Sequence, residues 1–79
     1  TLLDSTIWEI DSERDRQEEK WGQQNHDDKT WLAILVEEVG EIARAMNDRT
    51  DDYTHDELVQ TTAVCVAWLE AIRRRNGTS

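Results

Sequence analysis

Basic residues, cysteines and long apolar runs are scarce in this sequence, and each shortage excludes a class of protein. The 79 residues include 9 lysines and arginines against 18 aspartates and glutamates, a formal net charge of −9. A field of that sign repels a polyanion and attracts a divalent cation, so we expect no nucleic-acid partner. No run of 18 apolar residues occurs, so the sequence predicts no membrane-spanning helix and no membrane partner.

The cysteine content and the N-terminus bear on the cellular compartment. Cys65 is the only cysteine, so a disulfide within the chain is excluded, and a lone thiol suits a reducing environment. The N-terminus has no basic segment followed by an apolar core, as a secretion signal would have. We therefore expect a cytoplasmic protein. The chain begins at Thr1 rather than Met, which suggests trimming.

The length and the distribution of aliphatic residues indicate one small helical domain. A chain of 79 residues allows one domain at most, so residues 1–79 are taken as a single unit. Leucine, isoleucine and valine make up only 16 residues, but they cluster in residues 31–46 and 58–72. Such clustering is typical of folded helices with polar connections. The predicted helices are residues 5–20, 29–47 and 54–75, with breaks at 21–28 and 47–53.

The ends of the second and third helices carry capping signals. Asp27 or Asp28 can cap the second helix, because a carboxylate satisfies the free N–H groups there. The segment from Thr54 to Glu57 has the spacing of a capping box for the third helix. Arg73 to Arg75 suit the negative end of that helix, and Asn76-Gly77 is a stop signal.

The second helix is expected to bury one broad apolar face. Gly40 lies outside that face, and its cost of about 1 kcal/mol relative to alanine suggests a close backbone approach or a nearby ligand, although simple tolerance explains it equally well. At 100° per residue the apolar positions that share the face are Leu32, Leu35, Val39, Ile42 and Met46.

The third helix has almost no polar face between Thr61 and Ile72, so it must be surrounded. Two other helices of one short chain cannot cover it. We therefore expect an all-α bundle completed by homodimerisation or by a dimer of dimers. The apolar side chains point in three directions, set by Leu58 with Leu69, by Val59 with Val66, and by Val64 with Trp68 and Ala71.

Carboxylates recur at helical spacing on both long helices. Glu37, Glu38 and Glu41 lie on the second helix, and Glu57 stands at i,i+3 from Gln60 on the third. Two half-buried acidic patches on antiparallel helices repel unless a cation or protonation relieves them. Hard oxygen ligands without cysteine favour Mg²⁺, with Mn²⁺ as the alternative, over zinc. By helical geometry, Glu38 lies within about 40° of Trp31, Ile34, Ile42 and Ala45.

Each of these carboxylates also has a structural interpretation. Glu57 can be the reciprocal half of a capping box with Thr54. The acidic segment 48–56 can attract a cation, but it matches no twelve-residue calcium loop and is more simply a solvated loop. The remaining charges on the second helix also form an ordinary solvated stripe, namely Glu37, Glu41, Arg44 and Asp48.

Two long runs of residues resemble a known family. The sequence WLAILVEEVGEIARAM, residues 31–46, and DELVQTTAVCVAWLEAI, residues 56–72, resemble the MazG-like all-α nucleoside triphosphate pyrophosphohydrolases. The segment ERDRQEEKWGQQNHDD, residues 13–28, is similar to the N-terminal part of the small phage-type and cassette-encoded members. The resemblance covers about residues 7–72. Its signature is ExxE followed by ExxD, whose four side chains hold magnesium in the family.

The resemblance implies a magnesium site and an activity. Glu38 and Glu41 match ExxE, whereas Glu57 and Gln60 match ExxD with glutamine in place of the final aspartate. A neutral amide removes one charge, so affinity falls unless Glu37, Asp56 or a water takes over the position. The implied reaction is cleavage between the α and β phosphates of a nucleoside triphosphate. Glu37 or Glu38 is the candidate that orients or deprotonates the attacking water.

The loop between the first two helices offers candidate substrate contacts. An indole can stack on a base, and an asparagine can recognise its hydrogen-bonding edge. The structural alternatives are a core position for Trp31, an anchor role for Trp21 and a cap role for His26. The candidates for the base are Trp21, Asn25, His26 and Trp31, and those for the phosphates are Lys20 and Lys29.

The sequence therefore predicts a homo-oligomeric, magnesium-dependent nucleotide pyrophosphohydrolase, with removal of non-standard or excess nucleotides as a possible role. The competing hypothesis is a helical dimer that has lost turnover and binds a nucleotide or a protein. Gln60 supports that alternative, because it removes a carboxylate from the signature. A helical DNA-binding regulator would need a basic recognition face, which the sequence does not contain.

Overall fold

The computed structural model describes residues 1–48 and 51–77, and within these residues all regular structure is helical. The three helices are α1 (Leu2–Trp21), α2 (Asp28–Asp48) and α3 (Asp51–Arg75). The predicted all-α class and the number of helices are confirmed. In this part of the chain, no helix combines the length and the apolar character that a bilayer crossing requires.

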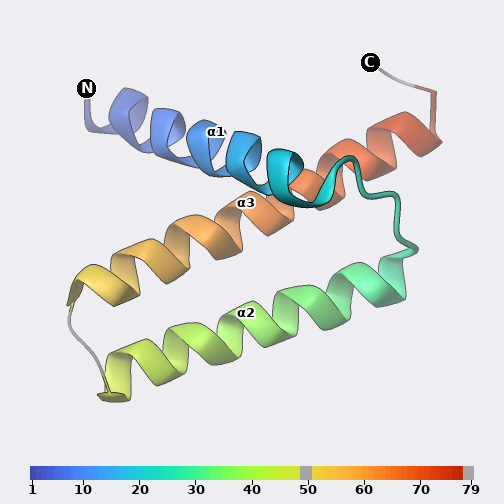
Figure 1. Cartoon of the computed structure of the whole chain (residues 1–79). Helices are drawn as coiled ribbons and strands as arrows, with labels where there is room; N and C mark the ends of the chain where they lie inside the picture. Colours follow the sequence, from blue (N-terminus) through green and yellow to red (C-terminus); the bar gives the residue numbers. More distant parts are fainter. Residues whose placement is uncertain (49–50, 78–79) are drawn as a thin grey trace.

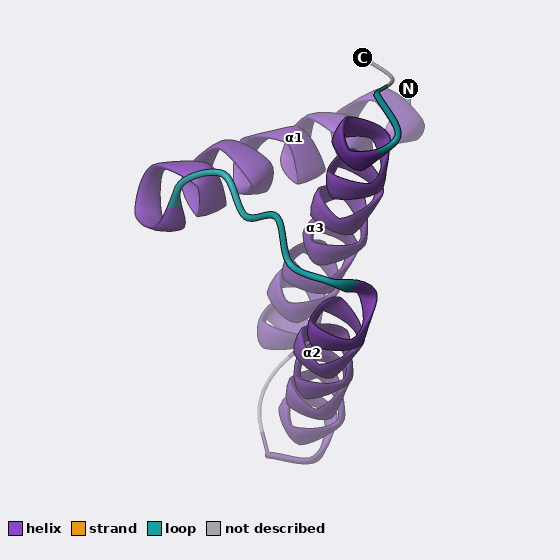
Figure 2. Cartoon of the chain, turned by 90° about the vertical axis from the view of Figure 1, so that its right-hand side faces the viewer, coloured by secondary structure: helices purple, strands orange, loops and turns teal. Residues whose placement is uncertain are grey.

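Helix α3 is the element that holds the other two together. It packs against both α1 and α2. Helices α2 and α3 form an antiparallel hairpin, and α1 lies on the opposite side of α3 (Figure 1). In the view turned by 90°, α1 crosses the hairpin at a steep angle and extends to one side of it (Figure 2). A single chain therefore leaves large parts of α1 and α2 without a helical neighbour.

The helix ends follow local capping chemistry. Helix α1 begins earlier than predicted, because Thr1 and Asp4 form a capping box in which the Asp4 N–H donates to Thr1 Oγ1 at 3.1 Å. The Thr30 N–H donates to Asp27 Oδ1 at 2.9 Å, so Asp27 caps α2. Gly77, at φ 75°, closes α3 in the left-handed conformation that glycine adopts readily.

The predicted capping box at Thr54 is wrong. Helix α3 begins at Asp51, so Thr54 lies inside its first turn instead of at its cap. The segment contains no proline or glycine that would prevent the helix from extending further toward its N-terminus. The interpretation of Glu57 as a capping residue fails with it. The predicted cation-attracting segment 48–56 lies partly outside the described residues.

The core is centred on one aromatic residue and several small ones. Trp31 is 2% exposed and is the one large side chain that is fully buried among the described residues. It packs against Val64, Ala67 and Ala71 of α3. The short alanine side chains leave room for the indole between the helices. The structural interpretation of Trp31 as a core residue is therefore confirmed.

The predicted apolar face of α2 is only partly buried. Leu35 and Ile42 are half-buried, but Leu32, Val39 and Met46 are more than half exposed. Trp31 and Ala45 are the residues that α2 buries against α3. The apolar arc of α2 is wider than one neighbouring helix can cover, so its outer half remains open. The exposed large apolar side chains of α2 and α3 are Leu32, Val36, Val39, Met46, Tyr53, Leu58 and Leu69.

Polar contacts fix α1 on α3. None of the twenty residues of α1, all of them described, is fully buried. Arg14 Nε and Nη2 donate to Glu70 Oε1 at 3.0 and 2.7 Å. Five residues earlier on α1, Glu9 Oε2 lies 2.6 Å from His55 Nε2 of α3. These contacts place α1 at a defined position along α3 even though its apolar contribution to the core is small.

A close backbone approach, one of the explanations offered for Gly40, is not found among the residues that the structure describes. An added Cβ at this position would meet nothing within 4 Å. Glycine inside a helix costs about 1 kcal/mol relative to alanine through backbone entropy.

We expect Gly40→Ala to raise the free energy of unfolding by about 1 kcal/mol, because the substitution removes this entropic cost without a clash. Urea unfolding followed by circular dichroism measures the change. Ala33→Gly, at another exposed position of α2, should lower the stability by a similar amount. A loss of stability in Gly40→Ala would show that another backbone approaches Gly40.

Candidate functional site

Glu38 occupies an apolar stretch of α2. Trp31 and Ala45, each 2% exposed, lie two turns before and after it on the same face. Its Oε2 atom is buried and makes no hydrogen bond. Burial raises the pKa of the Glu38 carboxyl, and the charges of Glu57, Glu41, Glu37 and Glu13 raise it further, in that order. The predicted location of Glu38 beside apolar surface is confirmed.

Glu57 faces the same region from α3. It is half-buried, and its Oε2 atom is also buried without a hydrogen-bond partner. Glu57 exerts the largest of the charge effects on Glu38. Two carboxylates from two helices thus meet in a partly dehydrated place, where each lacks the hydrogen bonds that normally accompany a buried oxygen.

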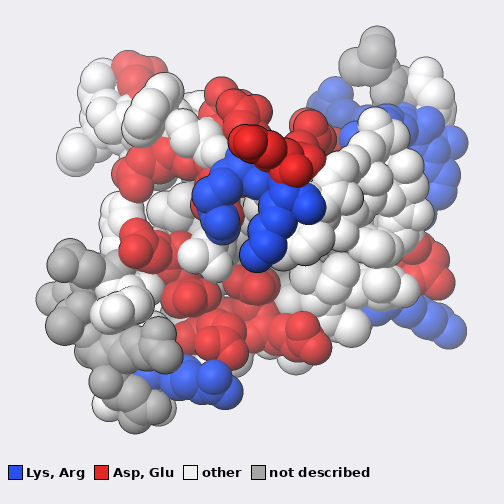
Figure 3. Space-filling model, in the orientation of Figure 1, with Lys and Arg blue, Asp and Glu red and all other residues white. Residues whose placement is uncertain are grey.

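The remaining predicted acids are less enclosed. Glu41 is half-buried, and its Oε1 atom forms an ion pair with Arg44 Nη1 at 3.2 Å. Glu37 is exposed. Acidic side chains gather where α2 and α3 meet (Figure 3). The solvated-stripe interpretation therefore fits the exposed Glu37 and Arg44, and it fits the half-buried Glu41 only in part.

A cavity of about 240 Å³ connects this acidic region with α1. Glu38 and Gln60 line it together with Trp21 and Trp31, so four predicted site residues share one hollow. The sequence analysis missed the contribution of α1, whose charged residues resemble an ordinary solvated face. The other residues that line the cavity are Glu13, Arg16, Gln17, Gln24, Ile34 and Val64.

Glu13 and Arg16 form a tight pair at the edge of the cavity. Arg16 Nε donates to Glu13 Oε1 at 2.9 Å, and Arg16 Nη2 donates to Glu13 Oε2 at 2.6 Å. The side chain of Glu13 is 12% exposed, whereas that of Arg16 is 55% exposed. The i,i+3 spacing on α1 is the only sequence signal for this pair, and such pairs are common on helix surfaces.

The predicted metal ligands are not assembled into a complete set. Among residues 1–48 and 51–77, no three carboxylate, imidazole or thiol side chains are placed to hold one metal ion. Glu38 and Glu57 nevertheless each present an unpartnered carboxylate oxygen, and Gln60 lines the cavity beside Glu38 with its amide, whereas Glu57 does not line it. These are hard oxygen donors of the kind that Mg²⁺ and Mn²⁺ prefer. The donor types fit such an ion, but a third charged ligand would have to move.

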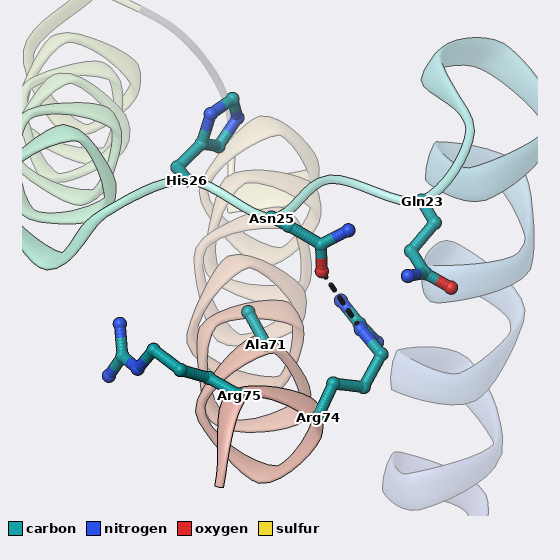
Figure 4. Close-up of a pocket in the computed structure, with 6 residues that line it drawn as sticks. All are labelled: Gln23, Asn25, His26, Ala71, Arg74 and Arg75. Atoms are coloured by element: carbon teal, nitrogen blue, oxygen red, sulfur yellow. Dashed lines mark hydrogen bonds between the residues drawn. The ribbon is translucent and has the colours of Figure 1, made fainter. Parts of the chain in front are cut away.

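A second hollow, of about 320 Å³, lies between the α1–α2 loop and the end of α3. In Figure 4 the amide of Asn25 points toward Arg74, whereas the His26 ring turns away from the arginines. Asn25 Oδ1 accepts from Arg74 Nε at 3.0 Å. Arg75 donates to Asp28, with Nη2 at 3.2 Å from Oδ1. Arg74 and Arg75 therefore hold the loop, a role that their position at a helix end did not indicate.

The structure separates the predicted base-binding residues into two groups. Trp21 and Trp31 line the acidic cavity, while Asn25 and His26 line the hollow at the loop. His26 packs its ring edge against Trp31, with centroids 5.0 Å apart. Both His26 Nε2 and Trp31 Nε1 are buried without a hydrogen-bond partner, so each retains a polar atom that a ligand or a water can satisfy.

The two predicted phosphate-binding lysines are both exposed. Lys20 Nζ lies 4.6 Å from the centroid of the Trp21 ring, so the cation and the indole stay close to the mouth of the acidic cavity. Lys29 is exposed at the start of α2 and lines neither hollow. Lys20 is therefore better placed than Lys29 for a ligand in the acidic cavity.

Comparison of the chain with protein-family models, with curated proteins and with solved structures gives no significant match in any of the three. The resemblance to the MazG-like family thus rests on the sequence motifs, and the site is assessed by its own geometry.

Glu38→Gln should make the folded chain more stable than the wild type at neutral pH, because it removes a carboxylate whose pKa is raised on folding. At pH values below the usual glutamate range both states of the wild type are protonated, so the difference should vanish. It should grow as the pH rises from that range through the folded pKa of Glu38, since the unfolded chain ionises first. Urea midpoints measured from pH 3 to pH 8 without divalent cations test this.

The control for this series is Glu19→Gln, which removes an exposed carboxylate of α1 whose charge has no part in the raised pKa of Glu38. Its stability should follow that of the wild type across the pH range. Equal profiles for the two variants would contradict the assignment of a raised pKa to Glu38.

Proposed function

We propose that this chain is a magnesium-dependent nucleoside triphosphate pyrophosphohydrolase of the MazG-like type, which converts a nucleotide into its monophosphate and pyrophosphate. The observation that carries the proposal is the meeting of Glu38 and Glu57, whose buried oxygens lack partners at the junction of α2 and α3. A divalent cation would relieve both the desolvation and the repulsion. Discarding non-standard or excess nucleotides is the corresponding cellular role.

Glu38, Glu41, Glu57 and Gln60 would hold the ion. Glu38 and Glu57 contribute their unpartnered oxygens, and Glu41 can join after leaving its exposed ion pair with Arg44. Gln60 supplies a neutral amide oxygen from the cavity wall. The chemistry that magnesium supplies at such a site is charge neutralisation on the triphosphate, polarisation of the α-phosphoryl group and activation of a water. Manganese has similar oxygen preferences and should substitute for it.

Of the two candidate bases, Glu38 is better placed than Glu37. Glu38 lines the cavity, where its carboxylate can contact a water beside the bound nucleotide. Glu37 is exposed on the neighbouring position of α2 and does not line the cavity. We assign to Glu38 the orientation of the attacking water and the acceptance of its proton, in addition to its share in holding the cation.

Trp21 is the preferred residue for stacking on the base. Its ring is half exposed at the cavity, with Lys20 beside it to meet a phosphate or the base edge. Trp31 is buried and shapes the cavity floor, where its unpartnered Nε1–H can donate to a ligand. Asn25 and His26 belong to the hollow at the loop, so they would meet only a group that extends beyond the cavity. Lys29 is exposed and lines neither hollow, so its position does not favour a phosphate-binding role.

The alternative is a helical module that binds a nucleotide or a protein without turnover. Two observations favour it, namely Gln60 in a position that would otherwise carry a charge and the incomplete ligand set among the described residues. Turnover with magnesium decides between the two functions, because a binding module would hold the nucleotide and release no pyrophosphate.

We also propose that two or more copies of the chain assemble, as a homodimer or a dimer of dimers. The support is the exposed apolar surface of α2 and α3, because exposed apolar surface often marks a contact between protein chains. A core with one large buried side chain is small for an independent domain, and a shared core would add to it. We propose no nucleic-acid or membrane partner, because the net charge of −9 disfavours binding to anionic surfaces.

Pyrophosphate release should be observed with at least one deoxynucleoside or ribonucleoside triphosphate in the presence of Mg²⁺ and should disappear with a chelator. Glu38→Gln, Glu41→Gln and Glu57→Gln should each lower kcat/KM by about 100-fold or more, because each removes a charged ligand. Glu19→Gln, an exposed acid of α1 that lines no cavity described above, is the matched control and should retain activity. No release from any nucleotide would remove the enzymatic proposal and leave the binding module.

Light scattering at micromolar concentration should give a particle of at least twice the 9.2 kDa mass of one chain. Val36 is 61% exposed on the apolar side of α2, so Val36→Arg should weaken the assembly by about tenfold or more in Kd, a change in free energy of about 1.4 kcal/mol. Ala33→Arg places the same charge on the polar side of α2 and should leave the assembly intact. A stable 9.2 kDa wild type contradicts the proposed assembly.

A further inference from the structure

Arg16 is the one basic side chain that lines the acidic cavity, and it also lines a neighbouring hollow of about 440 Å³. This 440 Å³ hollow lies between α1 and the first half of α3. Glu13 and Gln60 line both spaces as well. Arg16 thus stands at the boundary between two openings, where its long side chain can turn toward either. The other residues that line the 440 Å³ hollow are Trp8, Glu9, Ser12, Asp56 and Val59.

The present partner of Arg16 is a carboxylate from the same helix. The two charge-assisted hydrogen bonds to Glu13, at 2.9 and 2.6 Å, match the paired donors of a guanidinium to the two oxygens. Gln17 Nε2 donates a third, weaker bond to Glu13 Oε2 at 3.3 Å. Glu13 is almost enclosed, so its charge depends on Arg16 for compensation.

A nucleotide with its cation would offer a new partner to Arg16 and another to Glu13. A row of phosphate oxygens offers a guanidinium the same paired acceptors as a carboxylate does. A cation between Glu38 and Glu57 would offer Glu13 a replacement for the positive charge of Arg16. The described residues place no third charged ligand beside those two acids, and Glu13 is a nearly buried carboxylate that lines the cavity together with Glu38.

We propose that the Glu13–Arg16 pair is exchanged when a metal-bound nucleotide enters the cavity, so that Arg16 binds the phosphates and the released Glu13 completes the carboxylate set of Glu38 and Glu57. This inference rests on the proposed function and adds two α1 residues to it. Arg16 acts as a specificity residue for a phosphorylated ligand. Glu13 acts as a ligand that the free protein keeps neutralised.

The position of α1 makes this exchange feasible. The pair lies one turn before Lys20, with Trp21 next to it, so phosphate, cation and base contacts follow one another along α1. Arg14 ties the same part of α1 to Glu70 of α3 through two hydrogen bonds to Oε1. The helix therefore stays in place while the Arg16 side chain changes partner.

The test is a pair of binding titrations that respond in opposite directions. Without nucleotide, Arg16→Gln should bind Mn²⁺ about tenfold more tightly than the wild type, because Arg16 no longer competes for Glu13. The same variant should bind the Mg²⁺ complex of α,β-methylene dATP about tenfold more weakly, because the phosphate contact is lost. Electron paramagnetic resonance of free Mn²⁺ and calorimetry with the uncleaved nucleotide measure the two affinities.

Two further variants separate exchange from a loss of folding. Glu13→Gln should weaken Mn²⁺ binding about tenfold, opposite to Arg16→Gln, while circular dichroism stays unchanged. Arg16→Lys keeps the charge but loses the paired geometry, so its nucleotide affinity should lie between those of the wild type and Arg16→Gln. Arg75→Gln is the control, because Arg75 is similarly exposed, at 49%, and pairs with Asp28 away from the cavity. It should change neither affinity.

The outcomes also separate this inference from the proposed function. A wild type that releases pyrophosphate, with Mn²⁺ affinity unchanged in both Glu13→Gln and Arg16→Gln, overturns the exchange and leaves the enzyme. A wild type that releases no pyrophosphate but shows the opposite shifts in affinity supports the exchange in a binding module. A wild type that binds neither Mn²⁺ nor the nucleotide overturns both.

Discussion

The placement of a carboxylate in an apolar stretch of α2 is the constraint on which the rest of this structure depends. Glu38 lies between Trp31 and Ala45, the two residues that α2 buries, and opposite Glu57 on α3. Each oxygen that loses water without gaining a partner costs folding free energy. A sequence keeps such a cost where a ligand can recover it, and a divalent cation is the ligand that two converging carboxylates favour.

Helix α3 gives this arrangement its geometry. It is in contact with α2 on one side and with α1 on the other, so Glu38 of α2, Gln60 of α3 and the Glu13–Arg16 pair of α1 surround one cavity. Small residues on α3 allow Trp31 to reach the core, and that indole forms part of the cavity wall. The packing that stabilises the hairpin is therefore also the packing that shapes the proposed site. Stability and binding are coupled through the same few residues.

Most of the fold and about half of the candidate site could be predicted from local patterns. The spacing of apolar residues and the composition predict the three helices and the location of Glu38 beside apolar surface. They also predict the core position that was the structural alternative for Trp31. The start of α3 was misplaced, because the Thr54 capping spacing competes with an extension of the helix to Asp51. The MazG-like resemblance, the metal and the activity remain predictions.

The sequence by itself determined the helices, the acidic charge and the carboxylates at helical spacing, because those properties depend on neighbours within a turn or two of the chain. Only the tertiary structure decided which half of the apolar arc of α2 is buried and which residues of α1 reach the cavity. Glu13 and Arg16 have the spacing of any surface ion pair, and their place beside Glu38 depends on how α1 crosses α3. That crossing is set by contacts between residues far apart in the sequence, such as Arg14 with Glu70 and Glu9 with His55, which no local pattern encodes.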